Sequence, residues 1–178
     1  MSPHANHEIY RFCSRCGQTM VQRLLKDGEP KRPVCEACGY VVYLDPKVTV
    51  GTIISNANNQ VALVRRAIEP GYGKWSFPGG YVDRGETLIA AAAREAWEEA
   101  RLEIRVDGLI NIYSYPEQTS IVVVYGATSI GGQLRAEDES LEAGWFTEAD
   151  VPWSELAFPS TQQGLRQFFQ GLLSPHIV

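Results

Sequence analysis

The sequence of 178 residues has only three histidines, and all of them, His4, His7 and His176, lie close to a terminus. Chain ends are commonly poorly ordered, so a Ser-His-Asp or Cys-His catalytic arrangement in the core has no histidine to use. Long apolar runs are also missing: the strongest is "IVVVY" at 121–125, far shorter than the roughly 20 residues that span a bilayer. Acid–base chemistry must therefore rest on carboxylates, and we expect no membrane partner.

An excess of positive charge is missing too. The 16 Lys and Arg residues are outnumbered by 21 Asp and Glu residues, which gives a net charge of −5, so no basic field attracts nucleic acid or an anionic membrane. The first residues, "MSPHANHEIYRF", lack the basic region and apolar stretch of a secretory signal, so we expect a cytoplasmic location. A hydrophobic share of 44% predicts a packed core in one domain, or in a smaller domain with an appendage.

All four cysteines belong to one pattern near the start of the chain. They form two pairs, "CSRCG" with Cys13 and Cys16 and "CEACG" with Cys35 and Cys38, separated by residues 17–34. The glycine after each pair permits the tight turn of a zinc knuckle. Disulfides or reduced core thiols are the alternatives, but without an export signal the spacing favours a structural zinc ribbon. A unit of about forty residues buries too little apolar surface to fold alone, so the metal would supply its stability.

The segment between the cysteine pairs, "RLLKDGEPKR", raises the question of nucleic-acid binding. Its four basic residues are diluted by Asp27 and Glu29, which favours a solvated hairpin, and nucleic acid is not the partner we expect. The ribbon ends at the joint "DPK", because Pro46 resists continuing regular structure. We therefore expect two domains, 1–46 and 47–178.

From Val48 onward, β-branched apolar runs alternate with turn residues, which predicts strands. The turn "NANN" (56–59) joins the first two runs into a predicted hairpin, "EPGYGKWSFPGG" (69–80) is loop-like, and "GGQLRAEDESLE" (131–142) is an acidic loop. This order favours an α/β (α+β) fold, a mixed sheet flanked by helices. The expected strands are 48–55, 60–66, 104–115, 119–130 and part of "AGWFTEADVP", and the closing amphipathic helix is 160–173.

The stretch "GGYVDRGETLIAAAAREAWEEARL" (79–102) predicts a helix after the N-cap Thr87. Helical spacing clusters Glu95, Glu98 and Glu99, and we expect them on the face away from the sheet, with the alanines and Trp97 toward it. Like charges at these spacings disfavour each other, and no lysine stands at a facing position. The residues alone leave two alternatives: a solvated acidic face, or ligands for a hard divalent cation such as Mg²⁺.

The surrounding pattern resembles the Nudix box of hydrolases that act on nucleoside diphosphates linked to another moiety. It runs from Gly80 through Glu86 to "REAWEEARL" (94–102), after an upstream "FPGG". The family has glycine where Arg101 stands and a larger aliphatic residue at Ala96; all charged positions match. The resemblance extends over 48–178 and implies a three-layer α/β/α sandwich with a mixed sheet.

The resemblance also implies roles for the matching residues. Glu98 and Glu99 would hold catalytic Mg²⁺ or Mn²⁺, Glu95 would be a further ligand or the base that activates water, and Gly80 would offer its backbone carbonyl to the metal.

Two further features follow from the resemblance. Arg94 and Glu86 would form an ion pair that braces the loop. A glutamate from a later loop would complete the catalytic set, with Glu139 as the first choice and Glu142 as the second.

A zinc ribbon before a Nudix domain resembles plant-type FAD/ADP-ribose pyrophosphatases and, less closely, NADH pyrophosphatases, because "ELAFPST" (155–161) lacks the Gln-Pro-Trp part of the NADH signature. The implied reaction releases AMP and a phosphorylated product from FAD or ADP-ribose. Alternatives are an NADH pyrophosphatase, removal of a nucleotide cap from RNA, and a sensor that binds ADP-ribose-like ligands without cleavage. The family also suggests a homodimer.

Substrate contacts are open at this stage. Arg65 and Arg66 are candidates for binding phosphate, although salt bridging is the simpler interpretation. An adenine or flavin ring would need an aromatic platform. The candidates for it are Tyr72, Trp75, Tyr113, Tyr115 and Phe158.

Overall fold

Residues 10–116, 118–137 and 139–174 are described by the computed structural model. The chain divides into two units, Met1–Pro46 and Lys47–Val178, which are treated one at a time. His4, His7 and His176, which the sequence analysis excluded from catalysis, lie outside the described residues.

The first unit is built on a small antiparallel hairpin. Strand β1 (Met20–Arg23) pairs with β2 (Arg32–Cys35), and short bridges join Phe12 to Thr19 and Val34 to Val41. Its buried cluster consists of Cys13, Met20 and Cys35, with Tyr10 and Val42 packed against it. Such a core is too small to hold a fold by apolar burial alone.

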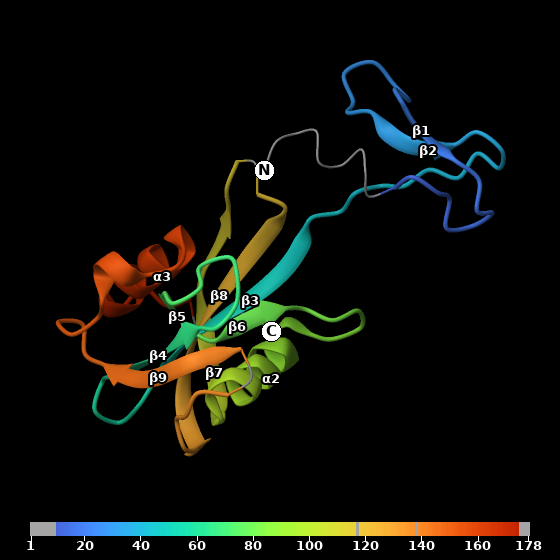
Figure 1. Ribbon diagram of the computed structural model, residues 1–178. Helices are drawn as coiled ribbons and strands as arrows, with labels where there is room; N and C mark the ends of the chain where they lie inside the picture. The colour runs from blue at the N-terminus through green and yellow to red at the C-terminus, as the bar shows by residue number, and fades with distance from the viewer. Residues whose placement is uncertain (1–9, 117, 138, 175–178) are drawn as a thin grey trace. The chain divides into compact units, whose positions relative to one another are not determined.

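The second unit contains a mixed sheet in the order β5-β4-β3-β8-β7, in which β6 also pairs with β3 and β9 with β4 (Figure 1). The central ladder is parallel, β3 with β8, and the β7–β8 pair is antiparallel. The sequence analysis expected this mixed sheet, and the structure confirms it. The strands are β3 (Lys47–Ser55), β4 (Val61–Arg66), β5 (Trp75–Ser76), β6 (Gly79–Tyr81), β7 (Leu102–Ser114), β8 (Ser120–Gly132) and β9 (Ser140–Phe146).

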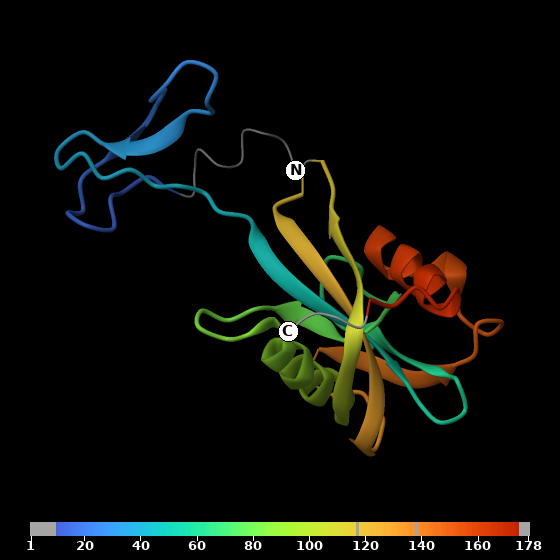
Figure 2. The ribbon, with the colours of Figure 1, turned by 180° about the vertical axis from the view of Figure 1, so that it is seen from behind.

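Two helices cover opposite faces of the strands, as Figures 1 and 2 show: α2 (Leu88–Ala100) and α3 (Pro159–Phe169), the latter after a short 3₁₀ turn, Trp153–Glu155. The alternation of strand side chains explains both contacts. In β3, Ile54 packs in the cluster that includes alanines of α2, whereas Ile53 packs with Leu165 of α3. The three-layer α/β/α sandwich is therefore confirmed.

The predicted hairpin between the first two strands of this unit needs correction. Strands β3 and β4 pair only at Ser55 and Val61, beside the turn. They then separate, because β3 pairs with β6 and β8 while β4 pairs with β5 and β9. The stretch 69–80, which was expected to be loop-like, contains the short strand β5 and the start of β6. Strand β5 pairs with β4, and β6 pairs with β3.

Helix α2 begins as predicted. The Thr87 side chain accepts a hydrogen bond from the Ala90 amide at 3.2 Å, the usual N-cap interaction. The helix ends at Arg101, whose backbone is left-handed (φ 53°, ψ 34°). Glycine adopts this left-handed conformation easily, which accounts for the glycine that the family has at this position.

The orientation of α2 differs from the expectation. The residues that face the sheet follow an i, i+3, i+4 stripe, and they include Glu95 together with Ala91, Ala92, Ala96 and Ala100. Trp97, expected on the sheet side, is 44% exposed. The physical reason is that Glu95 lies between Ala91 and Ala96 on this stripe, so burial of the alanines brings the carboxylate inward.

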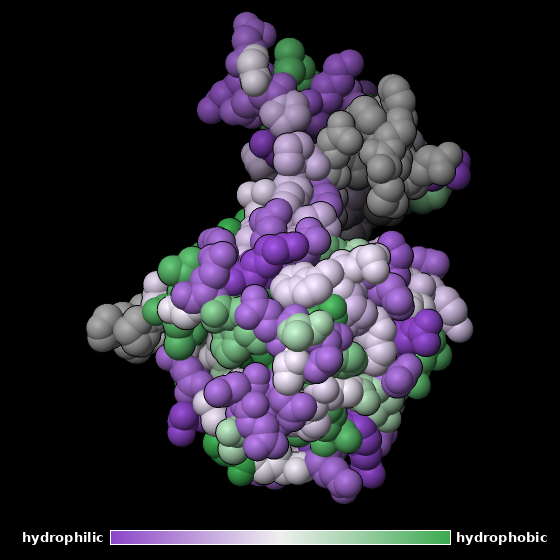
Figure 3. Space-filling model, turned by 90° about the vertical axis from the view of Figure 1, so that its left-hand side faces the viewer, coloured by the Kyte–Doolittle hydropathy of each residue, from purple (hydrophilic) through white to green (hydrophobic). Residues whose placement is uncertain are grey.

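None of the helices in the described part of the chain has the length and hydropathy of a membrane span. On the face drawn in Figure 3, hydrophobic residues are interspersed with hydrophilic ones.

Candidate functional site

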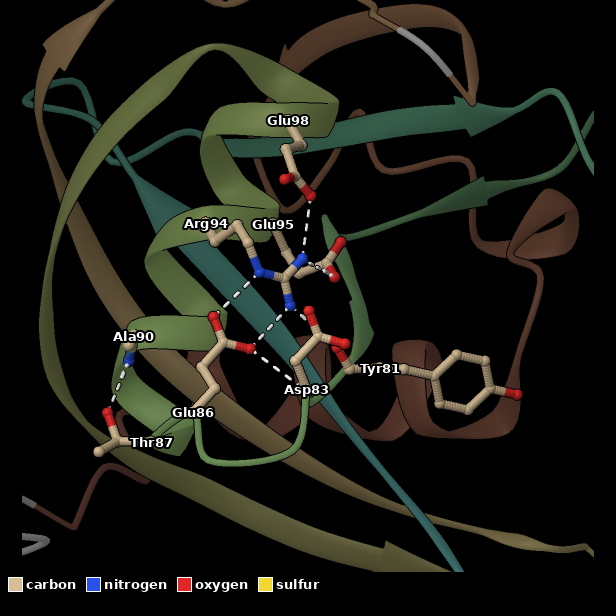
Figure 4. A network of polar contacts seen from close by, with 8 residues as sticks. All are labelled: Tyr81, Asp83, Glu86, Thr87, Ala90, Arg94, Glu95 and Glu98. Atoms are coloured by element: carbon tan, nitrogen blue, oxygen red, sulfur yellow. Dashed lines mark hydrogen bonds and ion pairs between the residues drawn. The ribbon is translucent and has the colours of Figure 1, made fainter.

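The centre of the candidate active site is the guanidinium of Arg94, which lies among three carboxylates (Figure 4). It donates to Glu86 at 2.9 Å, to Glu95 at 2.7 Å and to Glu98 at 2.9 Å. A second bond to Glu86, also 2.9 Å, makes that contact bidentate, and a fifth bond runs from Arg94 to the carbonyl of Tyr81 at 3.0 Å. The ion pair between Arg94 and Glu86 was expected from the resemblance. The bonds to Glu95 and Glu98 correct the expectation that the acidic stripe has no counter-charge.

Glu95 is held against the glycine loop. Only 8% of the residue is exposed, and a Cβ atom added to Gly80 would lie 2.5 Å from its Oε1. Burial raises the pKa of Glu95, although Arg94 acts in the opposite direction. The loop thus has to carry glycine at position 80, because any side chain there would occupy the place of the carboxylate.

Glu99 reaches the same loop from one turn further along α2. Its Oε2 accepts a hydrogen bond from the amide of Gly79 at 3.0 Å. Burial raises the pKa of Glu99 to about 7, and the negative charges of Glu95 and Glu139 add to the shift while Arg66 opposes it. For both carboxylates, burial outweighs the opposing effect of the nearby arginines, Arg94 for Glu95 and Arg66 for Glu99.

The two candidate loop glutamates have different surroundings. Glu139 is close enough to raise the pKa of Glu99 by its charge, and its backbone carbonyl accepts from the Ala67 amide at 2.7 Å. Glu142 instead forms a salt bridge with Arg65 at 3.6 Å, across the β4–β9 pair. Arg65 thus joins the neighbouring strands, and its Nε also donates to the Gly73 carbonyl at 2.7 Å. The choice of Glu139 as the glutamate from a later loop stays a prediction.

Arg66 and Phe158, which were separate candidates for substrate contacts, lie next to each other. The guanidinium of Arg66 lies 5.0 Å from the centroid of the Phe158 ring, and its Nε donates to the Pro70 carbonyl at 2.9 Å. Arg66 also acts electrostatically on Glu99. These two side chains thus offer a cation and an aromatic surface near the acidic cluster.

Trp75 does not have this role in the structure. It is 7% exposed and packs edge-on against Phe146 with ring centroids 5.0 Å apart. Because its ring belongs to the core, the expectation that Trp75 faces a substrate was wrong.

The three tyrosines proposed as ring platforms are placed differently from one another. Tyr72 is exposed, whereas Tyr113 is buried and donates to Gln167 of α3 at 2.8 Å. The rings of Tyr113 and Tyr115 are parallel, with centroids 6.3 Å apart. Tyr113 and Tyr115 hold α3 against the sheet, since Tyr115 donates to Gln163 of the same helix.

The oxygen-rich donor set of Glu95, Glu98 and Glu99 suits a hard divalent cation such as Mg²⁺ or Mn²⁺. The buried carboxylates with raised pKa values agree with this, because bound cations offset such charge in many sites. Residues that would hold such an ion are therefore present.

The four cysteines of the first unit form a separate metal site. Their Sγ atoms all lie within 4.8 Å of one another, and individual separations are 3.5 Å for Cys16–Cys35 and 3.7 Å for Cys13–Cys38. Four sulfurs at about 2.3 Å from a tetrahedral zinc lie about 3.8 Å apart. The arrangement fits a structural zinc ion, as the spacing predicted. The four thiols are not joined in disulfides.

The sequence analysis missed one contact beside the site. Arg101, noted only as a replacement for glycine, pairs with Glu137 at 3.3 Å. The two residues are far apart in the sequence, and no local pattern relates them. The only signal was the presence of a long charged side chain where the family has none.

Comparison with known proteins identifies the class to which this fold and site belong. The NUDIX domain family matches residues 45–170, and the Nudix N-terminal zinc ribbon family matches residues 11–44. The chain therefore belongs to the Nudix hydrolase family and carries its N-terminal zinc ribbon, as the box and the cysteine spacing indicated.

Particular relatives share most of the chain. It is 37% identical to an ADP-ribose pyrophosphatase of Methanocaldococcus jannaschii, over 67% of this chain and 71% of that protein. It is 29% identical to the NAD-capped RNA hydrolase NudC of Stutzerimonas stutzeri, over 90% of this chain but only 55% of that relative, so it spans about half of its length. The crystal structure of a NUDIX hydrolase from Nitrosomonas europaea superposes with a TM-score of 0.85 at 33% identity, covering 93% of this chain and 96% of that one.

Proposed function

We propose that this protein is a Mg²⁺- or Mn²⁺-dependent pyrophosphohydrolase that cleaves ADP-ribose or FAD into AMP and a phosphorylated product. The observation that carries the proposal is the placement of three glutamates of α2: Glu99 accepts from the Gly79 amide, Glu95 lies beside Gly80, and Arg94 joins Glu95 to Glu98. No histidine or covalent nucleophile is needed for this chemistry.

The proposed roles follow from the positions of the side chains. Glu98 and Glu99, with Glu95 and the Gly80 carbonyl, would hold the cation, which when bound neutralises charge on a diphosphate and lowers the pKa of water. As the alternative to a ligand role, Glu95 would be the base that takes a proton from the attacking water, a role that a raised pKa favours. Arg94 and Glu86 keep α2 and the loop in register.

The substrate class is supported by three observations. The relative in Methanocaldococcus jannaschii is named for ADP-ribose. Arg66 is available to phosphate, and Phe158 offers a partly exposed ring beside it. FAD carries the same ADP moiety, which is the part that such a subsite would recognise.

Product analysis tests the proposal. ADP-ribose, FAD, NADH and NAD⁺ are each incubated with the protein and Mg²⁺, and AMP release is measured. We expect release from ADP-ribose or FAD, and a loss of about 100-fold or more in Glu98→Gln and Glu99→Gln, since metal ligands are removed. Glu148→Gln, an exposed glutamate after β9, is the matched control and should retain parental activity.

Two other outcomes would replace the proposal. Release of AMP mainly from NADH or NAD⁺ would assign the protein to the activity suggested by the NudC relatives. Tight binding of ADP-ribose with no product, in the parent as in the variants, would make the protein a ligand sensor.

A further inference from the structure

Strand β7 is an outer strand of the sheet, and part of its outer edge has no neighbour in the described part of the chain. It comes last in the order β5-β4-β3-β8-β7. A short bridge joins Leu109 to Ser174 on this side, through backbone hydrogen bonds of 3.0 and 2.9 Å. The first residues of the strand, 102–106, show no such pairing among the described residues, so they lie beside an open edge.

The backbone of this segment is oriented for pairing. Burial alternates along it: the first, third and fifth residues are turned toward α2, whereas Glu103 and Arg105 are exposed. Residues whose side chains share one face of a strand direct their N–H and C=O groups to the same edge. Leu109 also packs on the α2 side, and its backbone forms the bridge at the outer edge. The N–H and C=O groups of Ile104 therefore point to the open edge as well.

Apolar surface borders this edge. A hollow of about 340 Å³ lies between β7 and α2, and its lining includes Ala93, Trp97 and Ile104. Ile89, Ala93 and Trp97 follow one another at four-residue intervals and form an exposed stripe on α2, with Ile89 42% and Trp97 44% exposed. Burial of this surface against another chain would be favourable.

Opposite charges stand on either side of Ile104. Arg105 is 64% exposed and contacts Asp107 at 2.9 Å, whereas Glu103 has no ion pair within the part of the chain that the structure describes. A strand edge that avoids pairing commonly carries lysine or proline. One charge of each sign, two positions apart, is instead complementary to a second copy of the same strand that runs in the antiparallel direction.

We propose that β7 is a dimerisation surface, which pairs with β7 of a second copy of this chain about a two-fold axis at Ile104. The axis places Ile104 opposite Ile104 of the partner subunit, and Glu103 opposite Arg105 of the partner subunit. Because the interface is symmetric, this pair of opposite charges occurs twice. Such cross-strand pairs stabilise a sheet, and like charges in the same positions destabilise it.

The two sheets would join into one, with both copies of α2 on the same face. Trp97 and Ala93 would then border the joined strands, and the other copy would close the hollow beside β7. The acidic cluster and the Arg66–Phe158 pair do not lie on this edge. The inference thus goes beyond the proposed function and does not depend on the substrate.

Sedimentation of charge-reversal variants tests the proposal in the zinc-loaded full chain. The parent should have twice the monomer mass of 19.8 kDa at about 0.1 mM, where a micromolar Kd gives mostly dimer. Glu103→Arg and Arg105→Glu each place like charges opposite one another in both pairs, so the Kd of the dimer should rise about ten-fold or more. Glu148→Arg reverses the charge of an exposed residue after β9, and as the matched control it should stay within about twofold of the parent.

A mixture of the two single variants decides the inference. Combined in equal amounts, Glu103→Arg and Arg105→Glu chains should form a heterodimer with a Kd within about threefold of the parental value, because every charge then faces its opposite. The double variant Glu103→Arg/Arg105→Glu should dimerise like the parent for the same reason. Recovery in the mixture also shows that both single variants are folded.

Three outcomes would overturn the proposal. One is a parent that is monomeric, whether the edge then stays free or is covered by residues 175–178. Another is a dimer that both single variants leave intact, since a different surface would then form the contact. The last is a pair of monomeric single variants whose dimer returns neither in the mixture nor in the double variant, which would exclude the register centred on Ile104.

Discussion

At the scale of single residues, the two adjacent glycines of the loop are predicted to respond differently to the same substitution. A Cβ atom on Gly79 would lie 2.2 Å from the carbonyl oxygen of Val50, and backbone cannot easily move away. Gly79→Ala should therefore lower the free energy of unfolding by about 1–3 kcal/mol, measured by urea denaturation.

A Cβ atom on Gly80 meets only the end of the Glu95 side chain. Gly80→Ala should leave the fold stable but displace the carboxylate, lowering kcat by about 100-fold. The two variants serve as each other's controls. Equal loss of stability in both would contradict the placement of Glu95.

The ion pair between Arg94 and Glu86 makes stability depend on pH. The hydrogen bond from Arg94 lowers the pKa of Glu86 below its ordinary value of 4.5. The folded state then binds fewer protons than the unfolded chain, so the contribution is present above pH 4.5 and is lost as the pH falls through the lower, folded pKa.

Glu86→Gln should therefore be less stable than the parent at neutral pH, and the difference should shrink in acid. Tm measured across this range checks it, with Glu148→Gln as the control. A difference that stays constant with pH would show that the charge of Glu86 is not responsible.

The sequence indicated which residues lie near one another only where local spacing decides it, and the roles of the glutamates stay predictions. Glu95, Glu98 and Glu99 lie within two turns of one helix, and the cysteine pairs define their own knuckles, so neither depends on distant packing. Trp75 could not be placed in this way. Whether its ring lies in the core or at the surface is decided by Phe146, which is far away in the sequence.

At the scale of elements, the start of α2 depends on one hydroxyl group. Thr87→Ala removes the bond to the Ala90 amide and should lower the free energy of unfolding by about 1 kcal/mol. Thr119→Ala, at an exposed threonine before β8, should change it little. Denaturant titration of both variants measures the difference. An equal effect would mean that the cap contributes nothing specific.

The orientation of α2 shows what periodicity leaves undetermined. The stripe was visible in the sequence, but alanine is compatible with a buried or an exposed face, and glutamate at the margin of the stripe was assigned to solvent. In the structure, the Gly79 amide donates a hydrogen bond to Glu99. This bond offsets part of the cost of turning a carboxylate of α2 toward the loop. The prediction of a β3–β4 hairpin was also wrong. It assumed that strands adjacent in the sequence stay paired along their length, whereas these two pair only beside the turn.

At the scale of the whole molecule, we propose that the two units are separate domains and that zinc stabilises only the first. Removal of zinc with a chelator should abolish amide protection in residues 10–46 while the β3–β8 ladder stays protected, because the core of the second unit contains no metal ligand from the cysteines. Exchange measured by mass spectrometry checks this.

Addition of zinc should restore protection in the first unit. Loss of protection throughout the chain would instead show that the units fold as one. A homodimer and a cytoplasmic location stay predictions from the sequence.

The parallel ladder between β3 and β8 also has a consequence for synthesis on the ribosome. Lys47 pairs with Ser120, and Ser55 with Thr128, so β3 has no partner on that side until β8 has been made. The glutamates of α2 are synthesised earlier than β8, while the sheet beneath them is incomplete. Because such distant pairings form slowly, we expect the sheet beneath α2 to be completed only after the helix and its glutamates have been made.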